Sequence, residues 1–111
     1  MTQLREHASF GRMQPAPGMT LAQLEWMRRI AERFGWAGNT FKYAKALALN
    51  AQPQAAGLAL AKLCKIQSPP KCRWAIDEWR SLAAEKYPEL RDVALPDEPM
   101  AESTPSREAR R

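Results

Sequence analysis

Two cysteines, Cys64 and Cys72, are the residues whose type and spacing point most directly to chemistry in this sequence. They flank the segment KIQSPPK, in which two consecutive prolines predict a tight corner between two helices. In an oxidising compartment, a disulfide across this corner would add about 2 to 3 kcal/mol to the free energy of unfolding by the loop-entropy estimate. The alternative is a pair of reduced cysteines that fill small gaps on apolar faces. Two cysteines without further ligands leave a tetrahedral zinc site half empty, so we expect no metal.

No group of residues in the sequence has the pattern of a catalytic centre. The single histidine, His7, stands in a segment without helical periodicity, and no local pattern holds a cysteine or a serine beside it. The sequence shows no glycine-rich phosphate loop and no paired metal-ligand spacing. Asp77 and Glu78 are neighbours on a predicted helix, so their side chains point about 100° apart and form a solvated edge. We therefore expect this chain alone to have neither enzymatic activity nor a cofactor.

The charge of the chain favours anionic partners. The sequence contains 17 Lys and Arg against 12 Asp and Glu, a formal net charge of +5, and most of the surplus lies between residues 21 and 87. A basic surface attracts nucleic acid, anionic lipid headgroups or a pyrophosphate-linked substrate, although in many small proteins it only keeps the surface hydrated. The residues that we expect to form a basic binding surface are Lys42, Lys45, Lys62 and Lys65.

Four tryptophans, Trp26, Trp36, Trp74 and Trp79, are many for a domain of this size. Trp79 falls on the predicted core face of its helix, whereas Trp74 lies off that stripe and Trp36 falls in a predicted loop. Bulky rings that fill a small core are one interpretation. The other is that Trp36 and Trp74 belong to a surface that binds a partner or a glycan.

The elements that would position these side chains are helices, and the fold class that we predict is all-α. We expect a small antiparallel array of about four helices joined by tight connections. The predicted segments are a flexible leader at 1–19, helices at 20–34, 39 or 40 to 49, 53–66 and about 70–87, and a disordered tail at 91–111. The helical domain thus spans residues 20–90.

Capping residues and apolar periodicity support these helices. Thr20 and Gln23 match a capping box, Asn39 or Thr40 can cap the second helix, and Pro53 suits the first turn of the third. The apolar residues at helical spacing are Leu21, Leu24, Met27, Ile30, Ala31 and Phe34 in the first helix, Ala56, Leu60, Leu63 and Cys64 in the third, and Ala75, Trp79, Leu82 and Ala83 in the fourth.

The segment from 41 to 69 resembles a single tetratricopeptide-type hairpin. It is a helix, a turn, a second helix and a proline, with the small residues Ala44, Ala56 and Gly57 where the two helices would cross. One such hairpin cannot bury its own face, so the first and fourth helices must cap it, or the domain must dock on a larger body. Gly57 would cost its helix about 1 kcal/mol relative to alanine unless close packing requires the missing side chain.

A longer string of residues carries a resemblance to a known family. The run NTFKYAKALALNAQPQAAGLALAKLCKI, followed by a second cysteine, a tryptophan and AEKYPEL, resembles the C-terminal domain of the Wzy-type O-antigen polymerase and ligase family. It is most similar to the pilin-type protein O-oligosaccharyltransferases, in the domain described as a virulence-factor membrane-bound polymerase C-terminus. The residues that carry the likeness are Phe41, Tyr43, Ala44, Ala46, Leu47, Ala48, Leu49 and Asn50, joined by Leu60, Leu63, Cys64, Trp79, Lys86, Tyr87 and Pro88.

The resemblance implies a parent enzyme that transfers a glycan from an undecaprenyl-pyrophosphate carrier to a protein or lipid acceptor. It places that enzyme at the periplasmic face of the inner membrane, with the catalytic residues in a membrane-embedded body that has no counterpart in this sequence. We therefore expect a non-catalytic accessory domain that is a fragment or truncated product of such an enzyme. Its expected partners are the membrane body, the acceptor protein or the carrier-linked glycan.

The alternative function is a free-standing, small basic helical protein that binds nucleic acid. Against it, no predicted helix presents a face rich in Arg, Asn and Gln, and helix-turn-helix spacing is absent.

No window of the sequence reaches the roughly 18 to 20 consecutive apolar residues of a transmembrane helix. The first residues also lack the pattern of an export signal.

Overall fold

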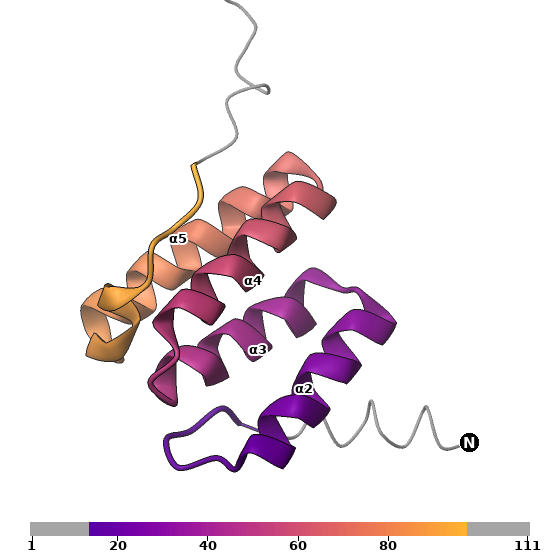
Figure 1. Cartoon of the computed structure of the whole chain (residues 1–111). Helices are drawn as coiled ribbons and strands as arrows, with labels where there is room; N and C mark the ends of the chain where they lie inside the picture. Colours follow the sequence, from indigo (N-terminus) through magenta and orange to yellow (C-terminus); the bar gives the residue numbers. More distant parts are fainter. Residues whose placement is uncertain (1–13, 98–111) are drawn as a thin grey trace, which may run out of the picture.

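The computed structural model describes residues 14–97, which form four α-helices and a short 3₁₀ helix without strands (Figure 1). The elements are α2 (Leu21–Phe34), α3 (Ala37–Leu49), α4 (Pro53–Ile66), α5 (Pro69–Glu85) and η1 (Pro88–Asp92). Helices that follow one another in the chain pack together, most extensively α3 with α4, and η1 packs against α5 and α3. The predicted all-α array is confirmed.

The ends of α2 follow from local chemistry. The Thr20 hydroxyl accepts a hydrogen bond of 3.0 Å from the Gln23 amide, and the Gln23 side chain accepts one of 2.8 Å from the Thr20 amide. This is the predicted capping box. Gly35 ends the helix with a φ of 61°, a left-handed conformation that glycine adopts without steric cost.

The start of α3 differs from the prediction. Neither Asn39 nor Thr40 is the N-cap, because the Thr40 amide already donates to the Trp36 carbonyl and the helix begins at Ala37. Trp36 occupies the capping position without a side-chain hydrogen bond, and Asn39 is buried within the first turn. A polar residue after a break was therefore an unreliable marker, since packing of Ala37 into the core extends the helix backwards.

The main core lies between α3, α4, α5 and η1. Its buried residues are Ala37, Phe41, Ala44, Leu47, Ala48, Leu49, Ala56, Leu60, Leu63, Ala75, Trp79, Ala83, Leu90 and Val93. A smaller cluster joins Leu24, Met27 and Ile30 of α2 to Ala46 of α3. The predicted apolar faces therefore do form the core, except at Leu21, which is 78% exposed in the first turn of α2.

The chain beyond residue 90 corrects the predicted boundary of the domain. Leu90 and Val93 are buried in the main core, and the Arg91 guanidinium donates to the Ala83 carbonyl over 2.9 Å. The Trp79 indole also donates to the Leu90 carbonyl, over 3.1 Å. The prediction that disorder begins at 91 is thus wrong for residues 91–97, because Val93 is buried in the main core and the Arg91 cation binds the end of α5.

The segment before α2 is also attached. The Asn50 side chain accepts a hydrogen bond of 2.8 Å from the Met19 amide and donates one of 2.9 Å to the Ala16 carbonyl. Pro15 is buried. The predicted flexible leader is therefore wrong for residues 14–19. The remainder of the predicted leader, with His7, and the predicted tail from 98 onward lie outside the described residues.

Gly57 has a different role from the one predicted. Ala44 and Ala56 are fully buried in the core that α3 and α4 share, but Gly57 faces the C-terminal segment. A Cβ added at Gly57 would lie 3.0 Å from the Ala94 carbonyl oxygen and 3.7 Å from a Val93 methyl group. Close packing therefore requires the missing side chain, as the cost to the helix suggested.

This contact leads to a prediction with an internal control. At Gly38, in the first turn of α3, an added Cβ meets nothing within 4 Å, so Gly38→Ala should raise the free energy of unfolding by about 0.5 kcal/mol. Gly57→Ala should give no such gain, because the crowded Ala94 carbonyl offsets the better helix propensity. Urea denaturation followed by circular dichroism measures both. Equal stabilisation by the two substitutions would show that the 93–94 segment does not pack on α4.

Candidate interaction groove and disulfide

Cys64 and Cys72 form a disulfide between the last turns of α4 and the first turn of α5, with their Cα atoms 4.6 Å apart. The predicted pairing is confirmed. Cys72 is buried and Cys64 is half-buried against the main core. The bond therefore joins two helices at the corner made by Ser68 and the following prolines, where the chain reverses direction.

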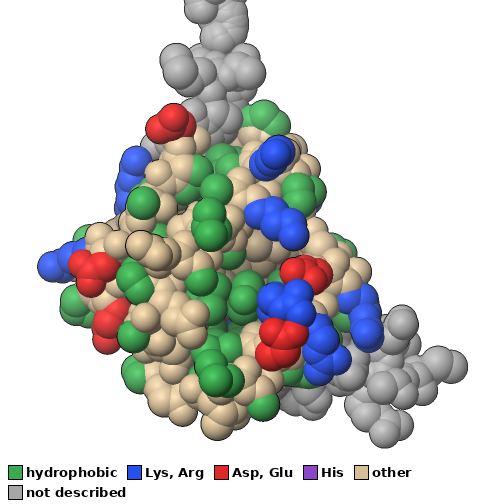
Figure 2. All heavy atoms as spheres, in the orientation of Figure 1, with side chains coloured by type: hydrophobic (Ala, Val, Ile, Leu, Met, Phe, Trp, Pro, Cys, Tyr) green, Lys and Arg blue, Asp and Glu red, His purple; other side chains and the backbone are tan. Residues whose placement is uncertain are grey.

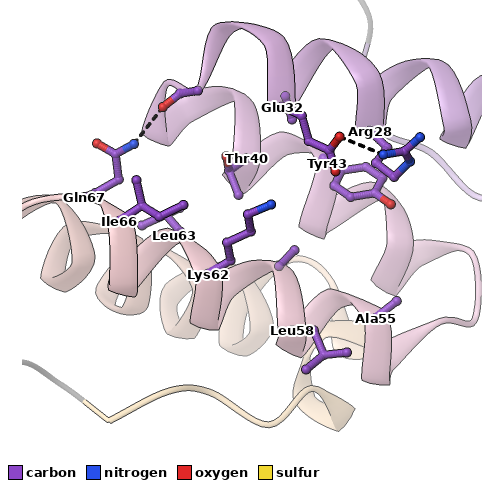
Figure 3. A pocket seen from close by; sticks show the side chains of 13 residues that line it. Arg28, Glu32, Thr40, Tyr43, Ala55, Leu58, Lys62, Leu63, Ile66 and Gln67 are labelled. Carbon is purple, nitrogen blue, oxygen red and sulfur yellow. Dashed lines mark hydrogen bonds and ion pairs between the residues drawn. The ribbon is translucent and has the colours of Figure 1, made fainter.

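A groove of about 560 Å³ separates α2 from α4, with α3 between them (Figure 3). Ala31, Ala55, Ala59 and Leu63 contribute apolar surface, and Leu58 and Ile66 stand exposed along α4. The polar lining is Arg28, Glu32, Thr40, Tyr43, Lys62 and Gln67. Figure 2 shows hydrophobic side chains through the middle of this face and charged side chains mostly toward its margins.

Hydrogen bonds fix the two sides of the groove. The Gln67 side-chain amide donates to the Gly35 carbonyl over 2.7 Å, so the end of α4 is tied to the corner between α2 and α3. On α2, the Arg28 guanidinium pairs with Glu25 and, over 2.7 Å, with Glu32. The Gln67–Gly35 hydrogen bond therefore joins the two sides of the groove, whereas the Arg28 ion pairs stay within α2.

The charged side chains on the two sides of the groove differ in their partners. The hydrogen bond with Arg28 lowers the pKa of the Glu25 carboxyl, and the two carboxylates raise the pKa of Arg28. Burial raises the pKa of the Tyr43 phenol at the base of the groove. Lys62 extends from α4 across the groove toward α2 (Figure 3). Among the described residues, Lys62 makes no ion pair with a carboxylate, whereas Arg28 makes two.

The four predicted lysines do not surround one site. Lys62 lines the groove, and Lys62 and Lys65 together line a shallow depression beside Ile66. Lys42 and Lys45 line neither, and burial, followed by the neighbouring Lys45 ammonium, lowers the pKa of Lys42. The basic surface therefore divides into a pair on α4 and a pair on α3.

The predicted aromatic residues also separate. Trp36 and Trp74 are both exposed, so the interpretation of these two as core residues is wrong. Trp36 has its ring centroid 6.2 Å from that of Phe34, and Trp74 lies 5.1 Å from Phe41. Trp79 is in the core as predicted. A role for the two exposed rings in binding stays a prediction.

The groove was not predicted from the sequence, although α4 contains a signal for it. Leu58 and Ile66 lie eight residues apart with Lys62 midway, on a different face from Leu60 and Leu63. A helix with a second aliphatic stripe has an unpartnered face. The part of the groove that α2 forms could be found only from the fold, because no local sequence pattern places Arg28 across from Lys62.

Histidine, cysteine, aspartate and glutamate side chains nowhere gather in threes around a possible metal ion within residues 14–97. In the same part of the chain, no helix combines the length and the apolar character that crossing a bilayer requires. No family model, curated protein or solved structure matches this chain.

Proposed function

We propose that this chain is a non-catalytic interaction domain of a membrane-bound glycan ligase or protein O-oligosaccharyltransferase. In this proposal it docks on the enzyme's membrane body or on the acceptor protein, at the periplasmic face of the inner membrane. The observation that carries the proposal is the groove between α2 and α4. Its aliphatic residues Leu58 and Ile66 are exposed along α4.

Two further features support the parts of the proposal that the groove does not address. The likeness of residues 26–90 to the Wzy-type C-terminal domain supports the connection with glycan transfer. The Cys64–Cys72 disulfide supports an oxidising compartment, because disulfides persist in the periplasm and are reduced in the cytosol.

The groove suits an apolar segment with an acidic residue at its edge. Such a segment, laid between α2 and α4, would cover Leu58 and Ile66 and bring a carboxylate to Lys62. Glu32 is already paired with Arg28, so it would repel the entering carboxylate less than a free glutamate would.

Leu58 has a matched control in Leu21, which tests the proposal directly. Both leucines are highly exposed, at 73% and 78%, but only Leu58 lines the groove. In the producing bacterium, with the gene in its native setting, Leu58→Glu should lower glycan transfer to the acceptor by about tenfold or more. A carboxylate would then have to be buried in an apolar contact.

The control variant Leu21→Glu should transfer glycan at the unchanged rate. Circular dichroism of both purified variants verifies that the helices remain folded. Full transfer by a folded Leu58→Glu variant would contradict the proposed role of the groove. Equal losses in both variants would contradict it as well, since Leu21 lies outside the groove.

A further inference from the structure

Tyr87, at the junction of α5 and η1, has two lysine ammonium groups over its ring. The Nζ atoms of Lys45 and Lys86 each lie 5.4 Å from the ring centroid. Lys45 comes from the middle of α3, and Lys86 is the C-cap of α5. The fold thus brings cations from two separate helices to one aromatic side chain.

The backbone holds this arrangement in place. The amides of Lys86 and Tyr87 both donate to the Leu82 carbonyl, over 2.9 and 2.8 Å, and the Leu90 amide donates to the Tyr87 carbonyl over 3.0 Å. The Tyr87 ring packs against the main core. The ring is therefore a fixed platform.

A third cation belongs to the same region. Lys42 lies one helical turn before Lys45 on α3. Burial is the main cause that lowers the pKa of Lys42, and the positive charge of the nearby Lys45 lowers it further. Among the described residues, neither Lys45 nor Lys86 has an ion pair with a carboxylate, and the nearby Glu85 and Glu89 are exposed. Like charges held together repel one another, and a bound anion would relieve that repulsion.

The negative charge at the C-terminal end of α5 is partly neutralised. The last carbonyls of a helix carry partial negative charge and would repel a negative ligand. Here the Arg91 guanidinium donates to the carbonyls of Ala83 and Ala84, over 2.9 and 3.4 Å, and offsets that charge.

We propose that Lys45 and Lys86, which both lie over the Tyr87 ring, form a binding site for a phosphate-bearing anion. Ammonium groups act as point charges that suit the several oxygens of a phosphate or diphosphate, and the phenol hydroxyl supplies a further donor. None of these residues lines the groove between α2 and α4. The site is therefore independent of the function proposed above, and either can fail without the other.

The test titrates the full oxidised chain with inorganic pyrophosphate and follows the amide signals by ¹H–¹⁵N NMR. Saturable shifts around Tyr87 are expected. The double substitution Lys45→Gln with Lys86→Gln should weaken binding by about tenfold or more, since the loss of even one charge-assisted contact costs roughly that factor. The matched control, Lys62→Gln with Lys65→Gln, removes the same charge from α4 and should change the affinity less than about twofold.

Vesicles of phosphatidylcholine with and without phosphatidylglycerol distinguish the source of the phosphate. Sedimentation with the anionic vesicles alone, lost in the Lys45/Lys86 variant and kept in the Lys62/Lys65 variant, supports a lipid headgroup. The same pattern with pyrophosphate supports a soluble ligand. Equal weakening in both double variants, or no saturable binding to either probe, overturns the proposal. Circular dichroism controls for folding.

Discussion

Replacing Trp79 with alanine should lower the free energy of unfolding by about 3 to 5 kcal/mol, which is a large part of the total for a domain this small. The Trp79 side chain is 1% exposed, and its ring meets Phe41 edge-on with the centroids 5.5 Å apart. Its indole also donates to the Leu90 carbonyl. The substitution removes the ring that connects α5 with α3 and with η1 and leaves a cavity, which urea denaturation would report.

Two further variants separate the contributions to this effect. Trp79→Phe keeps an aromatic ring but leaves the Leu90 carbonyl without its partner, so an intermediate loss of about 1 to 3 kcal/mol is expected. Trp36→Ala removes a ring of the same size that is 58% exposed and should cost less than about 1 kcal/mol. If Trp36→Ala and Trp79→Ala were equally destabilising, the assignment of Trp79 to the core would be wrong.

Reduction of the Cys64–Cys72 disulfide is expected to have the second-largest effect, a loss of about 2 to 3 kcal/mol in the free energy of unfolding. The bond closes a short loop and so restricts the unfolded chain. It also links α4 to α5, which otherwise share a smaller contact than α3 and α4 do. Denaturation of the same preparation with and without a phosphine reductant measures the difference.

The double variant Cys64→Ala with Cys72→Ala is the control for this experiment. It should have the stability of the reduced protein, within a few tenths of a kcal/mol, and the reductant should not change it further. Two alkylatable thiols in the native protein, when prepared under oxidising conditions, would show that the bond does not form. That result would also remove the support that the disulfide lends to a periplasmic location.

Most helix boundaries could be predicted because they depend on neighbouring residues. The capping box of Thr20 and Gln23, the left-handed Gly35 and the proline at the start of α4 each act within one turn. The start of α3 could not be predicted in this way, since core packing of Ala37 outweighed the capping preference of Asn39 and Thr40.

The ends of the folded domain could not be predicted from local sequence patterns either. The sequence after residue 90 is polar and interrupted by proline, but Val93 is buried in the main core and Ala94 packs against Gly57. At the other end, the Asn50 side chain binds the segment before α2. These contacts join residues far apart in the chain, and composition does not reveal them.

The candidate sites show the same division. The sequence determined the helical class, the capping of the first helix, the cysteine pair and the core position of Trp79, because each follows from periodicity or close spacing. Only the tertiary structure separated the four predicted lysines into two pairs, exposed Trp36 and Trp74, and brought Lys45 and Lys86 to the same Tyr87 ring. The physical reason is that a helix presents several faces, and the face that each neighbour covers depends on how the helices pack together.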